Sequence, residues 1–165
     1  NDIHDIRTTP ISGVFGNGSA ILGNKTSNSM PWGYGGQYDH GDAPLHAWTD
    51  GGDIDGLIIS DNHHRQGTGA PLMGIFLQAK DGGFTNLVAD GNTIETANGQ
   101  GFRVDGCSGV ISNTTLVWTD PTGDPKSEPR IDVNAPSHDL AINNTKGIVT
   151  VDAGLVNITI DGVLQ

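Results

Sequence analysis

The sequence predicts an all-β protein, a right-handed parallel β-helix of about six coils with very little helix. Two sets of short apolar strands alternate along the 165 residues. The step from a strand of the first set to the next strand of the second set is nearly constant, at 10, 12, 12, 8, 9 and 10 residues, whereas the step back varies from 8 to 24. No stretch keeps apolar residues at i, i+3, i+4 and i+7 over three turns, so we expect less than about 10% helix.

The first set of strands carries apolar residues at its first and third positions. Alternation with a period of two turns these side chains to one face, which we expect to be the core. The set comprises residues 11–14, 45–48, 75–78, 102–105, 131–134 and 148–151.

The second set has the same alternation and is followed by turn-forming polar residues. It comprises residues 21–24, 57–60, 87–90, 110–113, 140–143 and 158–161. Asn and Asp tolerate turn conformations, and at a spacing of about 4.8 Å between stacked strands they can hydrogen-bond one another as a ladder. The expected ladder is Asn24, Ser60, Asp90, Asn113, Asn143 and Asp161. A third strand is expected after some turns, over 1–4, 92–95 and 115–118.

Repeats with one constant side and one variable side carry their insertions on one face, which is often the binding face. The whole chain, 1–165, is therefore expected to be one β-helix segment with a long lateral insertion at about 25–56 and a second loop at about 118–130. The chain enters partway through a repeat and no cap is evident at either end. We expect it to belong to a longer chain or to an assembly, for which a homotrimer is the leading candidate.

The charge balance disfavours two classes of partner. Asp and Glu number 19 against 8 Lys and Arg, for a formal net charge of −11. Such a chain is repelled by phosphate backbones, so nucleic acid is not expected as a partner, and neither is an anionic membrane surface. No run approaches the roughly 20 apolar residues that a membrane span needs. The single cysteine, Cys107, is expected to be a small buried residue.

Four features of the sequence resemble the pectin-lyase-like right-handed β-helix superfamily. They are the spacing of the strands, the Asn residues that follow the second set, the run from Asp39 to His46, and the segment from Gly74 to Leu77. The resemblance covers essentially the whole chain and is specific for architecture. It implies a protein that binds or acts on polysaccharide, as polysaccharide lyases, epimerases, glycoside hydrolases, phage tailspikes and adhesins do, and an extracellular location or one on a virion or cell surface.

The insertion at 25–56 is the first candidate site because it gathers aromatic rings, carboxylates and imidazoles. Flat aromatic faces suit the C–H faces of sugars, and a pair of carboxylates suits acid and base work on a glycosidic bond. The expected glycan-binding aromatics there are Trp32, Tyr34, Tyr38 and Trp48. The expected catalytic residues are Asp39, His40, Asp42 and His46, together with Arg103. A long loop that packs its own aromatics over the flank would explain the same composition.

The outward positions of the first strand set are the second candidate site. Stacking is expected to align His46, Phe76, Arg103 and Asp132 along one exposed stripe, and Trp48, Gln78, Asp105 and Asn134 along a parallel one. Such a face could form the floor of a groove for an extended glycan. An ordinary solvated sheet face is the simpler interpretation.

Metal binding is weakly indicated. Asp50, Asp53 and Asp55 supply the hard oxygen ligands that calcium prefers, but they match neither an EF-hand loop nor a nonapeptide calcium repeat. His63 and His64 are neighbours in an extended segment and point to opposite faces, so they cannot serve one site. Calcium is therefore the one cofactor considered.

Three functions remain open on the sequence. The first is a polysaccharide-directed module that binds surface glycan as part of a tailspike-like or adhesin-like assembly. The second is a polysaccharide lyase, epimerase or glycoside hydrolase with its site around residues 39–53. The third is a purely structural spacer. The scattered cations disfavour a lyase for polyanions, because an acidic protein repels such a substrate.

Overall fold

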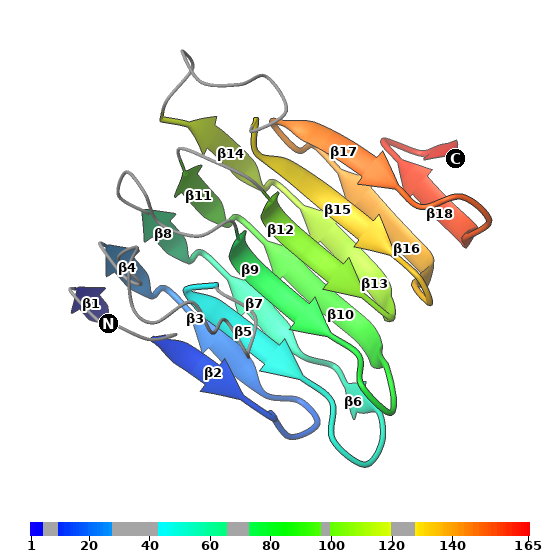
Figure 1. The fold of residues 1–165 in the computed structure, drawn as a ribbon, viewed down its shortest axis with the longest axis horizontal. Helices are drawn as coiled ribbons and strands as arrows, with labels where there is room; N and C mark the ends of the chain where they lie inside the picture. Colours follow the sequence, from blue (N-terminus) through cyan, green and yellow to red (C-terminus); the bar gives the residue numbers. More distant parts are fainter. Residues whose placement is uncertain (5–9, 28–42, 66–72, 97–99, 120–127) are drawn as a thin grey trace, which may run out of the picture.

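The computed structural model describes residues 1–4, 10–27, 43–65, 73–96, 100–119 and 128–165. Every regular element in these ranges is a β-strand, as the sequence predicts, and none of them is a helix (Figure 1). No helix of the described residues could therefore cross a membrane. The strands form three sheets, and all pairings are parallel except that of β18 with β19.

Successive strands belong to different sheets in a fixed rotation. From β2 to β16 the chain passes through a six-stranded sheet, then an eight-stranded sheet, then a five-stranded sheet, before it returns to the first. Each of these strands in the interior of a sheet therefore pairs with the strand one rotation earlier and the strand one rotation later. The two termini lie at opposite ends of this stack (Figure 1).

The six-stranded sheet contains all strands of the first predicted set. Its order is β17 (Ile148–Val151), β15 (Arg130–Asn134), β12 (Gln100–Asp105), β9 (Met73–Gln78), β5 (Leu45–Trp48) and β2 (Ile11–Gly13).

The eight-stranded sheet contains the second predicted set. Its order is β19 (Val163–Leu164), β18 (Val156–Ile160), β16 (His138–Asn143), β13 (Cys107–Ser112), β10 (Phe84–Asp90), β7 (Ile58–Ser60) and β3 (Ala20–Leu22). The short β6 (Ile54–Asp55) pairs with the beginning of β10.

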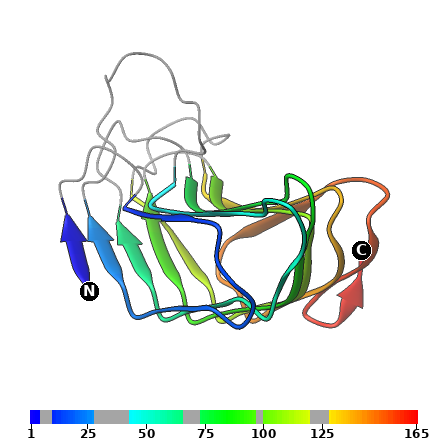
Figure 2. The same cartoon turned by 90° about the horizontal axis from the view of Figure 1, so that it is seen from below.

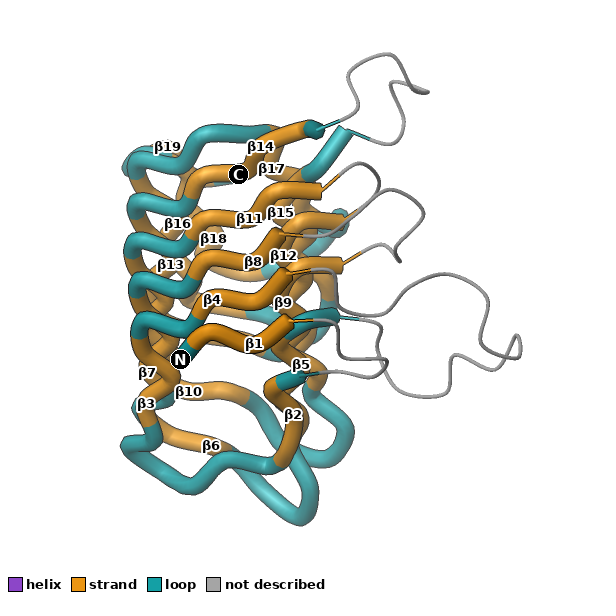
Figure 3. The backbone as a smooth tube through the Cα atoms, turned by 90° about the vertical axis from the view of Figure 1, so that its left-hand side faces the viewer, coloured by secondary structure: helices purple, strands orange, loops and turns teal. Residues whose placement is uncertain are grey.

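The five-stranded sheet contains the third strands, which Figure 3 shows one above the other. Its order is β1 (Asp2–His4), β4 (Lys25–Ser27), β8 (His63–Arg65), β11 (Thr93–Thr96) and β14 (Thr115–Trp118). Strands β4 and β8 were not predicted. The insertion predicted at 25–56 therefore begins with a strand of this sheet, and its later part includes β5 and β6.

The sheets surround the interior of the molecule (Figure 2). The inward side chains of successive strands form the core there. On the six-stranded sheet, Leu45, Ile75 and Phe102 are in register and fully buried. On the eight-stranded sheet, Ile59 and Ala89 continue the same core. Burying one such aliphatic or aromatic side chain stabilises the fold by about 1.5–3 kcal/mol. The predicted alternation is thus confirmed for these strands.

Two strands are aligned one residue away from the sequence prediction. Val110 pairs with Val88 and not with Leu87, so it points outward and is 37% exposed. The predicted match of Ile148 with Ile131 is also wrong, because Ile148 pairs with Arg130 and is 42% exposed. A shift of one residue exchanges the two faces of a strand, so these two residues leave the core.

A ladder of asparagines follows the strands of the eight-stranded sheet, but its members differ from those predicted. Asn24 is a member, as expected; the next two are Asn62 and Asn92, and all three are buried. The Nδ2 of Asn24 donates to the Oδ1 of Asn62 at 3.0 Å, and the Nδ2 of Asn62 donates to the Oδ1 of Asn92 at 3.1 Å. The buried amides thus satisfy one another along the stack.

The turn before each ladder residue explains the error. The residue that precedes each of the three ladder asparagines has a positive φ: Gly23, Asp61 and Gly91. Asn113, which precedes the buried Thr114 on the next rotation, has a positive φ as well. The left-handed conformation of each such residue turns the side chain of the next residue toward the interior. Gly, Asn and Asp adopt this conformation with little strain. Ser60 and Asp90 therefore end their strands on the outer face, and Asn113 is the turn residue.

Candidate functional site

The predicted stripe is a real column on the outer face of the six-stranded sheet. His46 pairs with Phe76, Phe76 with Arg103, and Arg103 with Asp132, on the consecutive strands β5, β9, β12 and β15. Thr150 on β17 extends the column beyond Asp132. Neighbouring members are therefore separated by about 4.8 Å, the spacing of adjacent strands.

A second column runs parallel to the first, two residues further along each strand. Trp48 pairs with Gln78, Gln78 with Asp105, and Asp105 with Asn134. All four side chains are partly exposed. The sequence predicted both the membership and the order of this column.

The first column is not the exposed stripe that the sequence predicts. His46 is 1% exposed, Phe76 4% and Asp132 7%. The Phe76 ring stacks on the imidazole of His46, with centroids 4.8 Å apart and planes 7° from parallel. The Arg103 guanidinium carbon lies 5.0 Å from the centroid of the same ring. Phe76 thus lies between neighbours on both adjoining strands, and its flat faces serve this stack and not an incoming sugar.

Trp48 also takes part in contacts within the protein. Its ring lies 5.0 Å from His46 in a tilted arrangement, and the Nζ of Lys80 lies 5.2 Å from its centroid. A cation over an indole face is a favourable contact of about 0.5–1 kcal/mol at an exposed site. The aromatic rings on the outer face of the six-stranded sheet therefore make their contacts within the protein.

The polar part of the face contains a bidentate ion pair on β12. The Nε of Arg103 donates to the Oδ1 of Asp105 at 3.0 Å, and its Nη2 donates to the Oδ2 at 3.1 Å. The Nδ2 of Asn134, on the neighbouring strand β15, donates to the same Oδ1 at 2.8 Å. Two residues on one face of one strand are thus linked, and a neutral donor from the next strand holds the carboxylate.

A related pair with a single Nε contact lies one strand further along the sheet. The Nε of Arg130 lies 3.2 Å from the Oδ1 of Asp132, and the Thr150 hydroxyl of β17 donates to this carboxylate. Arg103–Val104–Asp105 and Arg130–Ile131–Asp132 are therefore two Arg-x-Asp units, each with a donor from the adjoining strand. Sequence reasoning missed Arg130 and Thr150, although the Arg-x-Asp spacing is visible in the sequence and places both side chains on one face of a strand.

Several predicted site residues lie outside the described residues. These are the expected glycan-binding Trp32, Tyr34 and Tyr38 and the expected catalytic Asp39, His40 and Asp42. Of the expected catalytic set, His46 and Arg103 are described: the first is buried beside Phe76, and the second is paired with Asp105.

The three aspartates considered for calcium are exposed. The Oδ1 of Asp53 accepts the Gly83 amide at 2.7 Å, and the Oδ1 of Asp55 accepts the Thr85 hydroxyl at 2.8 Å and the Asn86 amide at 2.7 Å. These two hydrogen bonds lower the pKa of Asp55 below its usual value. Across the described ranges, no three His, Cys, Asp or Glu side chains gather as a metal site would require. Calcium at this segment stays a prediction.

Two other chemically distinctive groups are enclosed in the fold. His64 is fully buried, its Nδ1 lies 2.8 Å from the Thr26 hydroxyl, and burial together with the neighbouring His63 lowers its pKa to about 3. Burial, followed by the charge of Asp105, raises the pKa of the Cys107 thiol. A thiol of raised pKa carries little thiolate, so Cys107 is a packing residue, as the sequence predicts. His63 points outward to Glu95, which confirms that the two histidines face apart.

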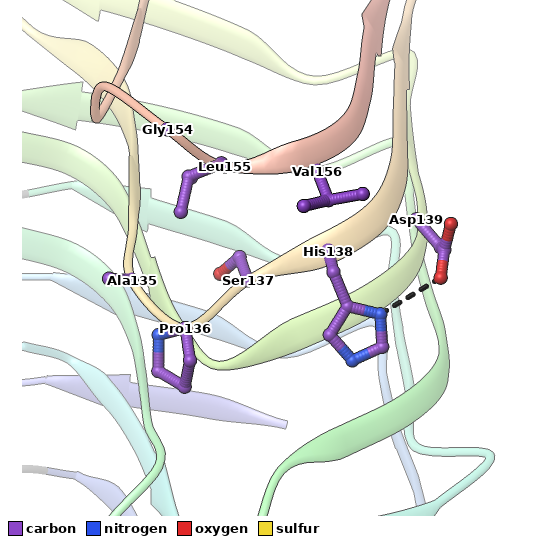
Figure 4. Close-up of a pocket in the computed structure, with 8 residues that line it drawn as sticks. All are labelled: Ala135, Pro136, Ser137, His138, Asp139, Gly154, Leu155 and Val156. Carbon is purple, nitrogen blue, oxygen red and sulfur yellow. Dashed lines mark hydrogen bonds and ion pairs between the residues drawn. The ribbon is translucent and has the colours of Figure 1, made fainter.

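A hollow of about 550 Å³ lies beside the turns that precede β16 and β18 (Figure 4). Pro136, Leu155 and Val156 supply apolar lining, and His138 pairs with Asp139 at 3.0 Å. Hydrogen bonds from Asn157 and His138 lower the pKa of Asp139. The hydroxyl of Ser137 is used within the fold, where it accepts the Cys107 amide. The hollow therefore brings one polar pair to an apolar wall, without a second functional group opposite.

Comparison with protein-family models, with curated proteins and with solved structures gives no match. The candidate site is therefore assessed on its geometry. The polar half of the outer face is defined by Gln78, Asn134, Thr150 and the two Arg-x-Asp units, which lie in register on β9, β12, β15 and β17.

Proposed function

We propose that this protein is a right-handed parallel β-helix that binds polysaccharide along the polar half of the outer face of its six-stranded sheet. The rotation of the chain through three parallel sheets supports this architecture, as does the buried asparagine ladder. Such repetition gives an extended, rigid surface, which suits a polymeric ligand better than a compact one.

The observation that carries the proposal is the in-register column of polar side chains. Gln78, Asp105 and Asn134 lie on consecutive strands at the strand spacing, beside Arg103 and Asp132. They offer hydrogen-bond donors and acceptors at regular intervals along the stack, as a chain of sugar hydroxyls requires. A glycan lying across the strands would meet one such group at each step.

Binding is favoured over catalysis. The imidazole of His46 is enclosed beside Phe76, and it would have to leave this stack to take a proton from a substrate. The lyase, epimerase and hydrolase alternative therefore depends on Asp39, His40 and Asp42. An assay for shortening of polysaccharide chains, with Asp42→Asn as the control, decides that alternative.

We further propose that the chain acts within a larger assembly, such as a homotrimer, outside the cell or on a virion or cell surface. The sheet edges support this setting: among the described residues, β2 and β17 each pair on one side only, and such an edge is a pairing site unless another segment or chain covers it. Sedimentation of the purified chain over a range of concentrations tests the assembly, and a monomer at every concentration would contradict it.

Affinity electrophoresis in gels that contain neutral polysaccharides tests the binding proposal. Arg103→Ala should weaken retention by about tenfold, because hydrogen bonds to charged groups contribute about 1.5–3 kcal/mol. Arg65→Ala is the matched control, since Arg65 is an exposed arginine on β8 of the five-stranded sheet. Equal retention of both variants and the wild type would refute this face as the binding surface.

A further inference from the structure

The two Arg-x-Asp units share a feature that bears on ligand choice: each guanidinium group on this face is already matched by a carboxylate of its own strand. Asp105 contacts both the Nε and the Nη2 of Arg103. This is the two-point geometry in which arginine binds carboxylate and phosphate ligands. Asp105 thus occupies the place that the carboxylate of an acidic sugar would take.

The carboxylates are held in place from the neighbouring strands. Asn134 donates to Asp105, and Thr150 donates to Asp132. Asp105 and Asp132 have side chains that are 13% and 10% exposed, whereas those of Arg103 and Arg130 are 35% and 34% exposed. An anionic ligand would have to displace a carboxylate that is mostly covered, hydrogen-bonded and attached to the same strand as the arginine.

The charges of the outer face also disfavour an anionic ligand. Two arginines and two aspartates cancel within the units, and the whole chain has a net charge of −11. A polyanion approaching the face therefore meets no uncompensated guanidinium group of the units and a repulsive protein field. A neutral sugar hydroxyl can donate to a carboxylate oxygen or accept from the outer guanidinium hydrogens without breaking either pair.

We propose that Asp105, which contacts two nitrogens of Arg103, and Asp132, which contacts the Nε of Arg130, are specificity-determining residues that mask the arginines and restrict this face to neutral glycans. The inference rests on the proposed glycan-binding function. It names the substrate class as uncharged polysaccharide and excludes uronate-rich and sulfated polymers.

The test is a gain of binding. Asp105→Asn removes the competing charge and should release the Arg103 guanidinium for an external anion. We expect dextran sulfate and polygalacturonate to retain the wild type no more than an inert gel does. The affinity of Asp105→Asn for these polymers should exceed the detection limit for the wild type by at least about tenfold. The double variant Arg103→Ala with Asp105→Asn should lose this gain, which would assign it to the freed guanidinium.

A matched control separates local unmasking from a change in net charge. Asp61→Asn also changes the formal charge from −11 to −10, but Asp61 lies beyond β7 of the eight-stranded sheet. Its φ of 55° suits asparagine as well as aspartate. This variant should gain no polyanion binding. Thermal melting of each variant verifies folding, and Asp132→Asn repeats the test at Arg130 should Asp105→Asn fold poorly.

The outcomes distinguish the two proposals. A wild type that prefers polyanions, or a folded Asp105→Asn that gains no polyanion binding, overturns the masking role. A wild type that binds no neutral polysaccharide overturns the proposed function, and the masking role is then judged by the gain in Asp105→Asn alone.

Discussion

Asn62 and Asn92 lie on successive rotations of the chain, and the side-chain Nδ2 of Asn62 donates to the Oδ1 of Asn92 at 3.1 Å. The same Nδ2 also donates to the carbonyl of Ile21 at 2.9 Å, while the Asn62 Oδ1 accepts both the backbone and the side-chain amide of Asn24 at 3.0 Å. One buried amide therefore links three neighbouring rotations of the chain.

Replacing Asn62 by alanine should destabilise the protein strongly. The change leaves the buried side-chain and backbone amides of Asn24 without their shared acceptor and removes one donor each from the Asn92 Oδ1 and the Ile21 carbonyl. Each unsatisfied buried group costs about 1–3 kcal/mol. We expect the free energy of unfolding to fall by about 3 kcal/mol or more in urea denaturation. Asn143→Ala, at the half-buried end of β16, should change it by less than about 1 kcal/mol. Similar losses for both variants would show that the ladder has no special role.

The buried His64 should make the protein less stable at mildly acidic pH. Its pKa is lowered from 6.5 to about 3 by burial and by His63, so the unfolded chain takes up a proton that the folded protein refuses. The unfolded state then binds more protons, and stability falls with falling pH by up to about 1.4 kcal/mol per unit. His64 contributes its full stability above pH 6.5 and loses it progressively towards pH 3.

Urea denaturation at several values between about pH 4.5 and pH 6, above the range in which the aspartates titrate, isolates this effect. His64→Gln should flatten the dependence on pH, whatever its effect on stability at neutral pH. His138→Gln, at an exposed histidine, should retain the slope of the wild type. An unchanged slope in His64→Gln would assign the acid sensitivity to another group.

Gly109 is required by the close approach of two strands. Its φ is +131°, and a Cβ at this position would lie 2.2 Å from the carbonyl oxygen of Leu87. Alanine should therefore force β13 away from β10 and lower the free energy of unfolding by more than about 3 kcal/mol. At Gly16 an added Cβ meets only the Ser19 Oγ at 3.8 Å, so Gly16→Ala is the benign control. Thermal melting of both variants measures the difference, and equal melting temperatures would contradict the packing described.

Calcium should leave the melting temperature unchanged. The Oδ1 atoms of Asp53 and Asp55 already accept hydrogen bonds from the segment that begins β10, and the described carboxylates do not converge. A ligand that binds the folded state raises its stability by linkage, so melting with millimolar calcium, and with magnesium as the control, is a direct assay. A rise specific to calcium would establish the site that the sequence weakly indicates.

The sequence was sufficient for the two predicted sets of strands because alternation and the spacing of turns are local properties. Leu45, Ile75 and Phe102 align as predicted because each begins a run with apolar residues at its first and third positions. The prediction was wrong at Val110 and Ile148, where the apolar run starts one residue away from the structural register. Hydrophobicity cannot set register when neighbouring residues are both apolar, and at Val110 the close packing of Gly109 decides it.

The sequence predicted which residues lie on the outer face of the six-stranded sheet, but it did not predict how exposed their side chains are. Alternation indicates that His46, Phe76 and Asp132 point away from the core, which the pairing confirms. It carries no information on the contacts that these side chains make on the outer face, where Phe76 stacks on His46 and Arg130 pairs with Asp132. Only the three-dimensional contacts show that the rings pack together while Arg103 pairs with Asp105.

The most direct test of the central claim is to map the bound glycan on the protein by NMR. Amide and side-chain signals would be compared with and without a neutral polysaccharide fragment that the protein retains. We expect shifts concentrated at Gln78, Arg103, Asp105 and Asn134 on the outer face of the six-stranded sheet, with the five-stranded sheet unchanged. Shifts confined to the other sheets, or no shift with any neutral glycan, would contradict it.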